Sequence, residues 1–152
     1  MIVKPFQISD YFKAHIARGL GLEFWDMRGG VFPILQYMEN SGTFWTLWRK
    51  DTVVLIAGYY QAFDGVCEVT LYPTEEFIKR PMGAVLIIKK RLLELRRQFR
   101  RIQLNCRQEP LFVDFAQWLG FTYEGTLRNF GYDGRNHNMM SIVRKENVSK
   151  KL

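Results

Sequence analysis

Apolar residues recur along the 152-residue chain with two different periods, and the changes of period divide it into helices and strands. Spacings of three and four place Val85, Ile88 and Leu92 on one face of a long helix and leave Lys89 on another face. Ser9 is a suitable N-cap for an earlier helix. The predicted helices lie over residues 9–18, 31–39, 81–99 and 110–119.

Extended segments rich in β-branched and aromatic residues fill much of the remaining chain. The pairs Lys50-Asp51 and Asp64-Gly65 are typical of two-residue turns, so they join successive segments as hairpins. The segment after the long helix is expected to pair in parallel with residues 66–72, because a helical crossover separates the two. The predicted strands are residues 2–6, 43–49, 52–62, 66–72, 101–106, 121–128 and 138–144.

These elements predict an α+β fold with a mixed sheet of about six to seven strands and about four flanking helices. One domain is expected over residues 1–145, because no repeat or low-complexity linker interrupts the pattern. Residues 146–152 are polar, and we expect them to form a frayed tail.

The junction between residues 66–72 and the long helix has the features of an anion-binding site. Backbone N–H groups in the first turn of a helix have no partner within the helix and carry partial positive charge. Pro81 suits the first helical position, and Gly83 lets a ligand approach the backbone closely. A pyrophosphate group would fit this helix start.

Two segments of the chain resemble the GNAT superfamily of acetyl-CoA-dependent N-acetyltransferases. Residues 80–85, Arg-Pro-Met-Gly-Ala-Val, resemble motif A, whose pattern is Arg/Gln-x-x-Gly-x-Gly/Ala. Arg80 and Gly83 match this pattern, whereas Val85 replaces its final small residue. Residues 118–125, Trp-Leu-Gly-Phe-Thr-Tyr-Glu-Gly, are similar to a passage of the ribosomal-protein acetyltransferase branch. Because the order of elements also agrees over nearly the whole chain, the resemblance implies the GNAT fold.

The resemblance also implies where acetyl-CoA would bind. Its thioester would lie along the strand before the junction, and its pyrophosphate would lie at the helix start. A primary amine, the acceptor, would attack the thioester directly, without a metal. The cofactor-binding residues implied are Val69, Thr70, Leu71, Tyr72, Arg80, Pro81, Met82, Gly83, Ala84 and Val85.

Glu68 is the candidate catalytic base, because it interrupts an apolar strand on which many GNAT enzymes carry a carboxylate. Solvent exposure or an ion pair with an arginine would explain the same residue. The tyrosine and asparagine found downstream in many members are replaced by Ala116 and Glu109. Tyr123 and Tyr72 could each take the place of the missing tyrosine as the acid, and Tyr123 is the candidate. Packing against neighbouring strands would explain both tyrosines equally well.

Other chemistry finds little support in the composition. Cys67 and Cys106 lack the spacing of a metal site, and the only histidines are His15 and His137, so no metal is expected. Two unpaired cysteines favour a reducing compartment. His137 lies in a polar loop and is expected to be exposed and structural, and Cys106 has no neighbouring histidine to make it a nucleophile.

The net charge of +7 is concentrated in one window, residues 79–107, which contains ten basic residues and one acidic residue. Lys89, Arg96 and Arg100 recur at about helical spacing and are expected to form one stripe. The stripe is interpreted as a solvated helix face, a site for an anionic ligand such as CoA, or a patch for an acidic partner. Nucleic acid is disfavoured as that partner, because no aromatic residues interleave the basic ones.

The leading function is acetyl transfer from acetyl-CoA to a primary amine, on a protein or a small molecule. The alternative is a catalytically inactive GNAT-fold structural or interaction protein, such as an internal core protein of a phage virion. Such proteins resemble this chain in size, degenerate motif A and the missing tyrosine. No apolar run approaches the ~20 residues of a membrane span, and no signal peptide is evident, so we expect a cytoplasmic or virion location.

Overall fold

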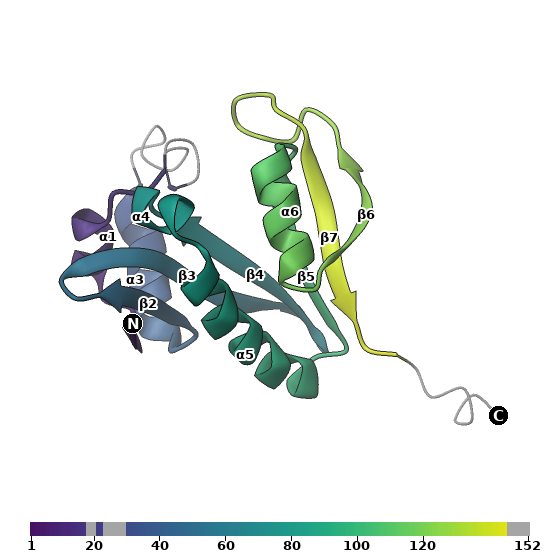
Figure 1. Ribbon diagram of the computed structural model, residues 1–152. Helices are drawn as coiled ribbons and strands as arrows, with labels where there is room; N and C mark the ends of the chain where they lie inside the picture. The colour runs from purple at the N-terminus through teal and green to yellow at the C-terminus, as the bar shows by residue number, and fades with distance from the viewer. Residues whose placement is uncertain (18–20, 23–29, 146–152) are drawn as a thin grey trace. The chain divides into compact units, whose positions relative to one another are not determined.

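The computed structural model describes residues 1–17, 21–22 and 30–145. Within that part of the chain it contains seven strands and five helices (Figure 1), which confirms the predicted α+β class. The strands are β1 (Ile2–Pro5), β2 (Phe44–Arg49), β3 (Thr52–Phe63), β4 (Val66–Pro73), β5 (Arg101–Arg107), β6 (Thr122–Leu127) and β7 (His137–Val143). The helices are α1 (Ile8–Lys13), α3 (Val31–Ser41), α4 (Glu75–Lys79), α5 (Met82–Gln98) and α6 (Pro110–Trp118).

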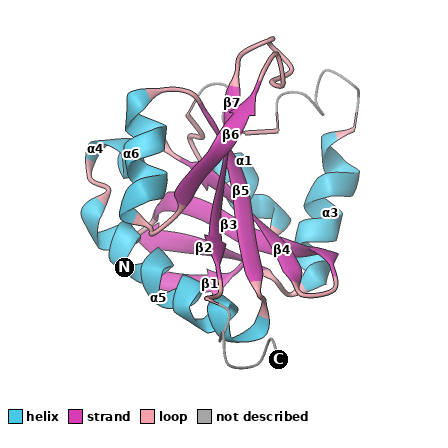
Figure 2. Cartoon of the chain, turned by 90° about the vertical axis from the view of Figure 1, so that its right-hand side faces the viewer, coloured by secondary structure: helices cyan, strands magenta, loops and turns pink. Residues whose placement is uncertain are grey.

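The strands, drawn in magenta in Figure 2, form one mixed sheet in the order β1-β2-β3-β4-β5-β7-β6, and Figure 1 shows β7 between β5 and β6. β4 and β5 are parallel, as predicted, because the crossover through α5 separates them. Their ladder is short, and both strands continue beyond it. It pairs Val66 with Arg101, Cys67 with Ile102, and Glu68 with Gln103.

The chain divides into two compact units. The first comprises Met1–Tyr60 and Val69–Ile88, and the second comprises Gln61–Glu68 and the described part of Lys89–Leu152. The strands β3 and β4 and the helix α5 each contribute residues to both units. A single domain over residues 1–145 therefore stays a prediction.

The first unit is built on an apolar cluster, and a buried acid lies beside β2. The cluster consists of Phe6, Leu22, Leu35, Met38, Phe44, Val53 and Ile56. Gly58 of β3 faces the Phe44 ring so closely that a Cβ would lie 2.3 Å from a ring carbon. The buried carboxylate of Asp10 accepts hydrogen bonds from Thr46 Oγ1 at 2.8 Å and from the amide of Gln7 at 3.0 Å. These bonds offset the cost of burying that carboxylate.

The second unit has one apolar and one polar side to its strands. Ile102 and Leu104 of β5 are buried, and Met140 of β7, paired with Leu104, is buried with them. Helix α6 packs against β5 and ends before Gly120, whose φ of +101° favours glycine. The intervening residues of β5, such as Gln103 and Asn105, alternate onto the other face of the sheet.

The long helix α5 confirms the predicted apolar face. Val85, Ile88, Leu92, Leu95 and the following Phe99 are all buried. At 17 residues α5 is the longest described helix, and none of the described helices could span a membrane.

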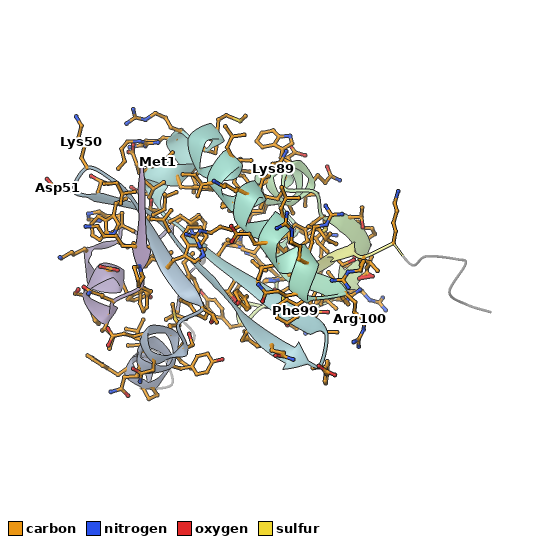
Figure 3. All side chains as sticks on the ribbon, turned by 90° about the horizontal axis from the view of Figure 1, so that it is seen from below. Met1, Lys50, Asp51, Lys89, Phe99 and Arg100 are labelled. Carbon is orange, nitrogen blue, oxygen red and sulfur yellow. The ribbon has the colours of Figure 1, made fainter. Side chains whose placement is uncertain are left out.

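The predicted basic stripe ends earlier than expected. Lys89 and Arg96 are exposed on α5, but Arg100 lies beyond the end of the helix, next to Phe99 (Figure 3). The guanidinium of Arg100 instead donates to the backbone oxygen of Asp64 at 2.7 Å and contacts the β3–β4 turn. The prediction that Arg100 belongs to a helical stripe was therefore wrong, because a hydrogen bond to a turn directs its side chain.

Two helix predictions in the first unit also need correction. The N-cap of α1 is Gln7 rather than Ser9. The helix ends at Lys13, because the backbone of the next residue, Ala14, is extended. Ile16 forms a β-bridge with Thr74, and the predicted end of the helix at Arg18 lies outside the described residues, as does the tail. The short helix α4 was not predicted. It is capped by Thr74, whose hydroxyl accepts from the Phe77 amide at 3.3 Å.

Candidate functional site

Two arrangements bear on function: a polar network in the second unit and a helix start in the first. At the centre of the network is Glu68, half-buried on β4. Gln103 Nε2 donates to Glu68 Oε2 at 3.2 Å, and Asn105 Nδ2 donates to Oε1 at 3.5 Å. Both donors lie on β5, where the register sets Gln103 opposite Glu68. The carboxylate is thus held from two sides by neutral amides.

The network continues beyond Gln103 to a pair of charges. Arg101 Nε donates to Gln103 Oε1 at 2.8 Å, and Arg101 Nη1 donates to Glu124 Oε2 at 2.9 Å. The hydrogen bonds from Arg101, opposed by desolvation, hold the pKa of Glu124 below its ordinary value. Arg101 is therefore linked to Glu68 only through Gln103, so the arginine ion pair considered for Glu68 is not what holds its carboxylate.

On the other side, the network reaches a histidine. His137 Nδ1 lies 2.8 Å from Asn105 Oδ1. The imidazole is half-buried and packs against Phe130, with 5.3 Å between the ring centroids. Desolvation, together with the charge of Arg107, lowers the pKa of His137, and Asp133 opposes this effect. The expectation that His137 is exposed was wrong, because the first position of β7 turns the ring towards β5; a structural role stays a prediction.

Tyr123, the candidate acid, does not share a face with Glu68. Tyr123 pairs with Met140, whereas Gln103 and Asn105 pair with Ser141 and Met139. Residues directly opposite in a ladder point to the same face, so Tyr123 lies on the face opposite to Glu68. Its hydroxyl is hydrogen-bonded to Thr126 Oγ1 at 2.8 Å.

The acid that replaces the downstream asparagine is paired with two arginines. Glu109 accepts from Arg135 Nη1 at 2.8 Å and lies 3.2 Å from Arg107 Nη2. Asp133 completes this cluster, at 3.3 Å from Arg135 Nε. The negative charge of Glu109 is therefore compensated within the second unit. Ala116, at the position of the missing tyrosine, is buried in α6.

The first turn of α5 leaves three backbone amides without a partner in the helix. The amide of Val85 donates to Pro81 O at 2.9 Å, which is the first bond of the helix. The amides of Met82, Gly83 and Ala84 consequently have no partner within the helix. The Val85 side chain is only 3% exposed and belongs to the core.

Arg80 lies immediately before this helix start and is tied to a carboxylate. Its Nη2 lies 2.6 Å from Glu76 Oε1, which also accepts from Arg49 Nη1 at 2.7 Å. Desolvation would raise the pKa of Glu76, but the charges and hydrogen bonds of Arg80 and Arg49 lower it overall. Because 69% of the Arg80 side chain is exposed, this ion pair contributes little to stability and Arg80 can turn to a ligand at low cost.

The remaining predicted cofactor residues lie along β4, after Glu68. Val69 is buried, whereas Thr70, Leu71 and Tyr72 are half-buried. Tyr72 packs against the apolar cluster of the first unit, and burial, together with the neighbouring Tyr11 and Tyr60, raises its pKa. Its phenol therefore stays protonated, and packing accounts for its position.

Both cysteines are free thiols in this structure. Burial raises the pKa of Cys67 and of Cys106 to about 11, so neither is a thiolate at neutral pH. Among residues 1–17, 21–22 and 30–145, no three histidine, cysteine or acidic side chains are grouped as metal ligands.

Sequence reasoning did not single out Gln103 and Asn105, and it did not place His137 beside Asn105. The signal for the first two was present, because polar residues occupy alternate positions of residues 101–107 and must share one face of a strand. The contribution of His137 depends on β7 lying beside β5, which local patterns do not determine.

The sequence itself matches no protein-family model and no curated protein. The fold, however, is similar to that of solved acetyltransferases. Ard1 from Thermoplasma volcanium matches with a TM-score of 0.71 at 18% identity, over 95% of this chain and 98% of that chain. The ribosomal-protein-alanine N-acetyltransferase from Brucella melitensis matches with a TM-score of 0.69 at 17% identity, over 94% and 99%. The yncA protein from Salmonella typhimurium, solved with its cofactor acetyl-CoA, gives 0.67 at 13%, over 97% and 95%. The chain therefore has the fold of the GNAT acetyltransferases.

Proposed function

We propose that this protein is an N-acetyltransferase that transfers the acetyl group of acetyl-CoA to a primary amine. The observation that carries the proposal is the order of features along β4 and α5. Glu68, held by two amides, is the last β4 residue of the short parallel ladder, and the segment from Val69 to Tyr72 follows it directly. The helix start with the unpaired amides of Met82, Gly83 and Ala84 comes next. In the GNAT fold, these segments are the ones that receive the thioester and the pyrophosphate.

The proposed chemistry needs few groups. A backbone N–H of the segment Val69 to Tyr72 would hold the thioester carbonyl and stabilise the tetrahedral oxyanion. Glu68 would take a proton from the attacking nitrogen as the C–N bond forms. The departing group is a thiol with a pKa near 8.5, like that of free cysteine, so it can leave as a thiolate that solvent protonates. Tyr123, on the other face of the sheet, is not needed.

The acceptor class is an amine, on a protein N-terminus, a lysine or a small molecule. The names of similar structures include a ribosomal-protein-alanine acetyltransferase and a spermidine acetyltransferase. An alanine-initiated peptide and spermidine are therefore the first acceptors to assay. Such substrates and acetyl-CoA fit a cytoplasmic location, which we propose with the activity.

CoA is expected to stabilise the folded protein. Binding at a hundredfold excess over Kd should add about 2.7 kcal/mol of stability. For a chain of this length, that raises the melting temperature by roughly 5–10 °C. The measurement is thermal unfolding with and without CoA at millimolar concentration. A well-folded sample with identical melting curves would contradict the proposed function and favour the inactive GNAT-fold interaction protein.

The helix start can be tested with a matched pair of glycines. A Cβ at Gly83 would meet only the terminal methyl of Met1, at 2.4 Å, and that flexible side chain can move aside. Gly83→Ala should therefore weaken CoA binding, because its methyl group lies beside the free amides, while the fold is retained. Gly125→Ala is the control, since a Cβ there has nothing within 4 Å. Equal CoA affinity of both variants would show that the helix start does not bind the pyrophosphate.

A further inference from the structure

Three side chains on neighbouring strands of the second unit form a hydrogen-bonded series: Glu68 on β4, Asn105 on β5 and His137 on β7. We propose that His137 is a second proton acceptor of the transfer reaction, and that Asn105 is the positioning residue that keeps its Nε2 free of a proton. This inference rests on the proposed acetyltransferase function, and it adds a residue to the chemistry assigned to Glu68.

The series has only one consistent arrangement of donors. An ionised carboxylate can only accept hydrogen bonds, so Asn105 must present its NH₂ group to Glu68. The carbonyl oxygen of the same amide then faces His137, and a carbonyl oxygen can only accept. The proton of the neutral imidazole must therefore reside on Nδ1, which leaves a lone pair on Nε2. Glu68 thus determines the tautomer of His137 through Asn105.

The Nε2 atom of His137 lies close to Gly131. A Cβ placed on Gly131 would lie 3.1 Å from this nitrogen, so a side chain at that position would cover it. Phe130 packs against the ring and limits its rotation. The nitrogen that carries the lone pair is therefore held beside Gly131.

Desolvation of the His137 ring, together with the charge of Arg107, lowers its pKa and keeps it neutral near pH 7. Arg107 on β5 faces His137 in the ladder, and its charge adds to desolvation in lowering the histidine pKa. Asp133 acts in the opposite direction, but it is paired with Arg135. Glu68 is separated from the ring by Asn105. A neutral imidazole can accept a proton at neutral pH, whereas a protonated one cannot.

Two protons leave the acceptor nitrogen during the proposed reaction. The acceptor arrives as an ammonium ion, and His137 Nε2 takes one proton from it, directly or through one water molecule. The free amine attacks the thioester carbon, the C–N bond forms, and Glu68 takes the second proton from nitrogen. The C–S bond breaks and releases the CoA thiolate. One of the two protons then neutralises this thiolate, and the other goes to solvent.

The tautomer can be tested without any activity. The chain has only two histidines, so His15→Gln assigns the imidazole signals in nitrogen-detected NMR of the 15N-labelled protein. We expect His137 to be the Nδ1–H tautomer above its pKa. Asn105→Leu removes the acceptor of the Nδ1 proton, so a substantial fraction of the His137 side chains should carry the proton on Nε2. An Nε2–H signal of His137 in the unsubstituted protein would overturn the proposal.

The catalytic role is tested by pH profiles of kcat/KM. His137→Gln should lower kcat/KM at neutral pH by about 10²-fold or more. It should also remove the acidic limb of the profile, which is the fall in kcat/KM at low pH caused by protonation of His137. Asn105→Asp places a carboxylate beside the ring and should move this limb to higher pH by about one unit or more. Asn40→Asp, on the exposed part of α3, is the control for added charge and should leave the profile unchanged.

The outcomes separate this inference from the proposed function. If the unsubstituted protein neither binds CoA nor transfers acetyl groups, the function fails and the role of His137 fails with it. If the protein is active while His137→Gln keeps the original rate and pH profile, only the inference about His137 is overturned. A lower rate with an unmoved limb in Asn105→Asp would also overturn it, because a purely structural residue gives that result.

Discussion

Glu68→Gln is expected to lower kcat/KM for acetyl transfer by about 10²–10⁴-fold, the range for a general acid–base group. Glutamine has the shape of glutamate but cannot accept the proton of the attacking nitrogen. CoA affinity should be unchanged, because the proposed pyrophosphate site lies at the start of α5. The measurements are steady-state kinetics with spermidine and with an alanine-initiated peptide, together with CoA titration.

Two comparisons make this result specific. Glu94→Gln removes the same charge from an exposed position of α5 and should leave kcat/KM unchanged. Melting curves of the Glu68 variant report whether its hydrogen bonds with Gln103 and Asn105 have been lost. A folded Glu68→Gln protein with full activity would return Glu68 to a structural role.

The largest loss of stability is expected for Ile102→Ala. Ile102 is fully buried on β5, and its ladder partners are Cys67 and Ile142. Truncation removes three buried carbons and leaves a cavity, which costs about 2–5 kcal/mol. The melting temperature should fall by roughly 4–20 °C at 2–4 °C per kcal/mol.

Val143→Ala is the matched control for this substitution. Val143 lies on β7 with 56% of its surface exposed, so its truncation should change the free energy of unfolding by less than about 0.5 kcal/mol. Chemical denaturation of both variants gives the comparison. Similar losses for the two positions would mean that the apolar face of β5 is not packed as the structure describes.

The sequence was most informative where an element has its own local markers. The predicted apolar face of the long helix is buried at all five of its positions, Val85, Ile88, Leu92, Leu95 and the following Phe99. An amphipathic helix needs only one apolar surface to pack against. The turn at Gly65 has a φ of +75°, which glycine adopts without strain. Such signals depend on neighbouring residues, so they could be read without knowledge of the fold.

Elements that depend on distant partners could not be read in this way. Phe12, Ile16 and Leu20 have helical spacing, yet α1 ends at Lys13 and Ile16 forms a bridge with Thr74. Phe12 is 60% exposed, so the apolar spacing of residues 9–18 does not mark one buried helix face. Thr74 with two following acids is a helix start, but five residues are too few to show a period.

In the candidate site, too, features with local markers could be predicted, and contacts between distant strands could not. Glu68 could be proposed because a lone acid in an apolar strand is conspicuous, but its partners depend on the strand order β4-β5-β7. Tyr123 could not be placed, because the ladder of β6 shifts between Tyr123 and Gly125. The extra residue, Glu124, changes the face on which Tyr123 lies. No local pattern in the sequence marks this bulge.

The position of β7 has a consequence for synthesis of the protein. β7 is the last strand in the chain, yet it lies between β5 and β6, which both leave the ribosome before it. Until residues 137–143 emerge, one edge of β5 is unpaired and β6 has no partner in the sheet. A nascent chain that has emerged only as far as the loop before His137 would therefore expose a strand edge that can pair with other chains. Holdase chaperones would act at this stage.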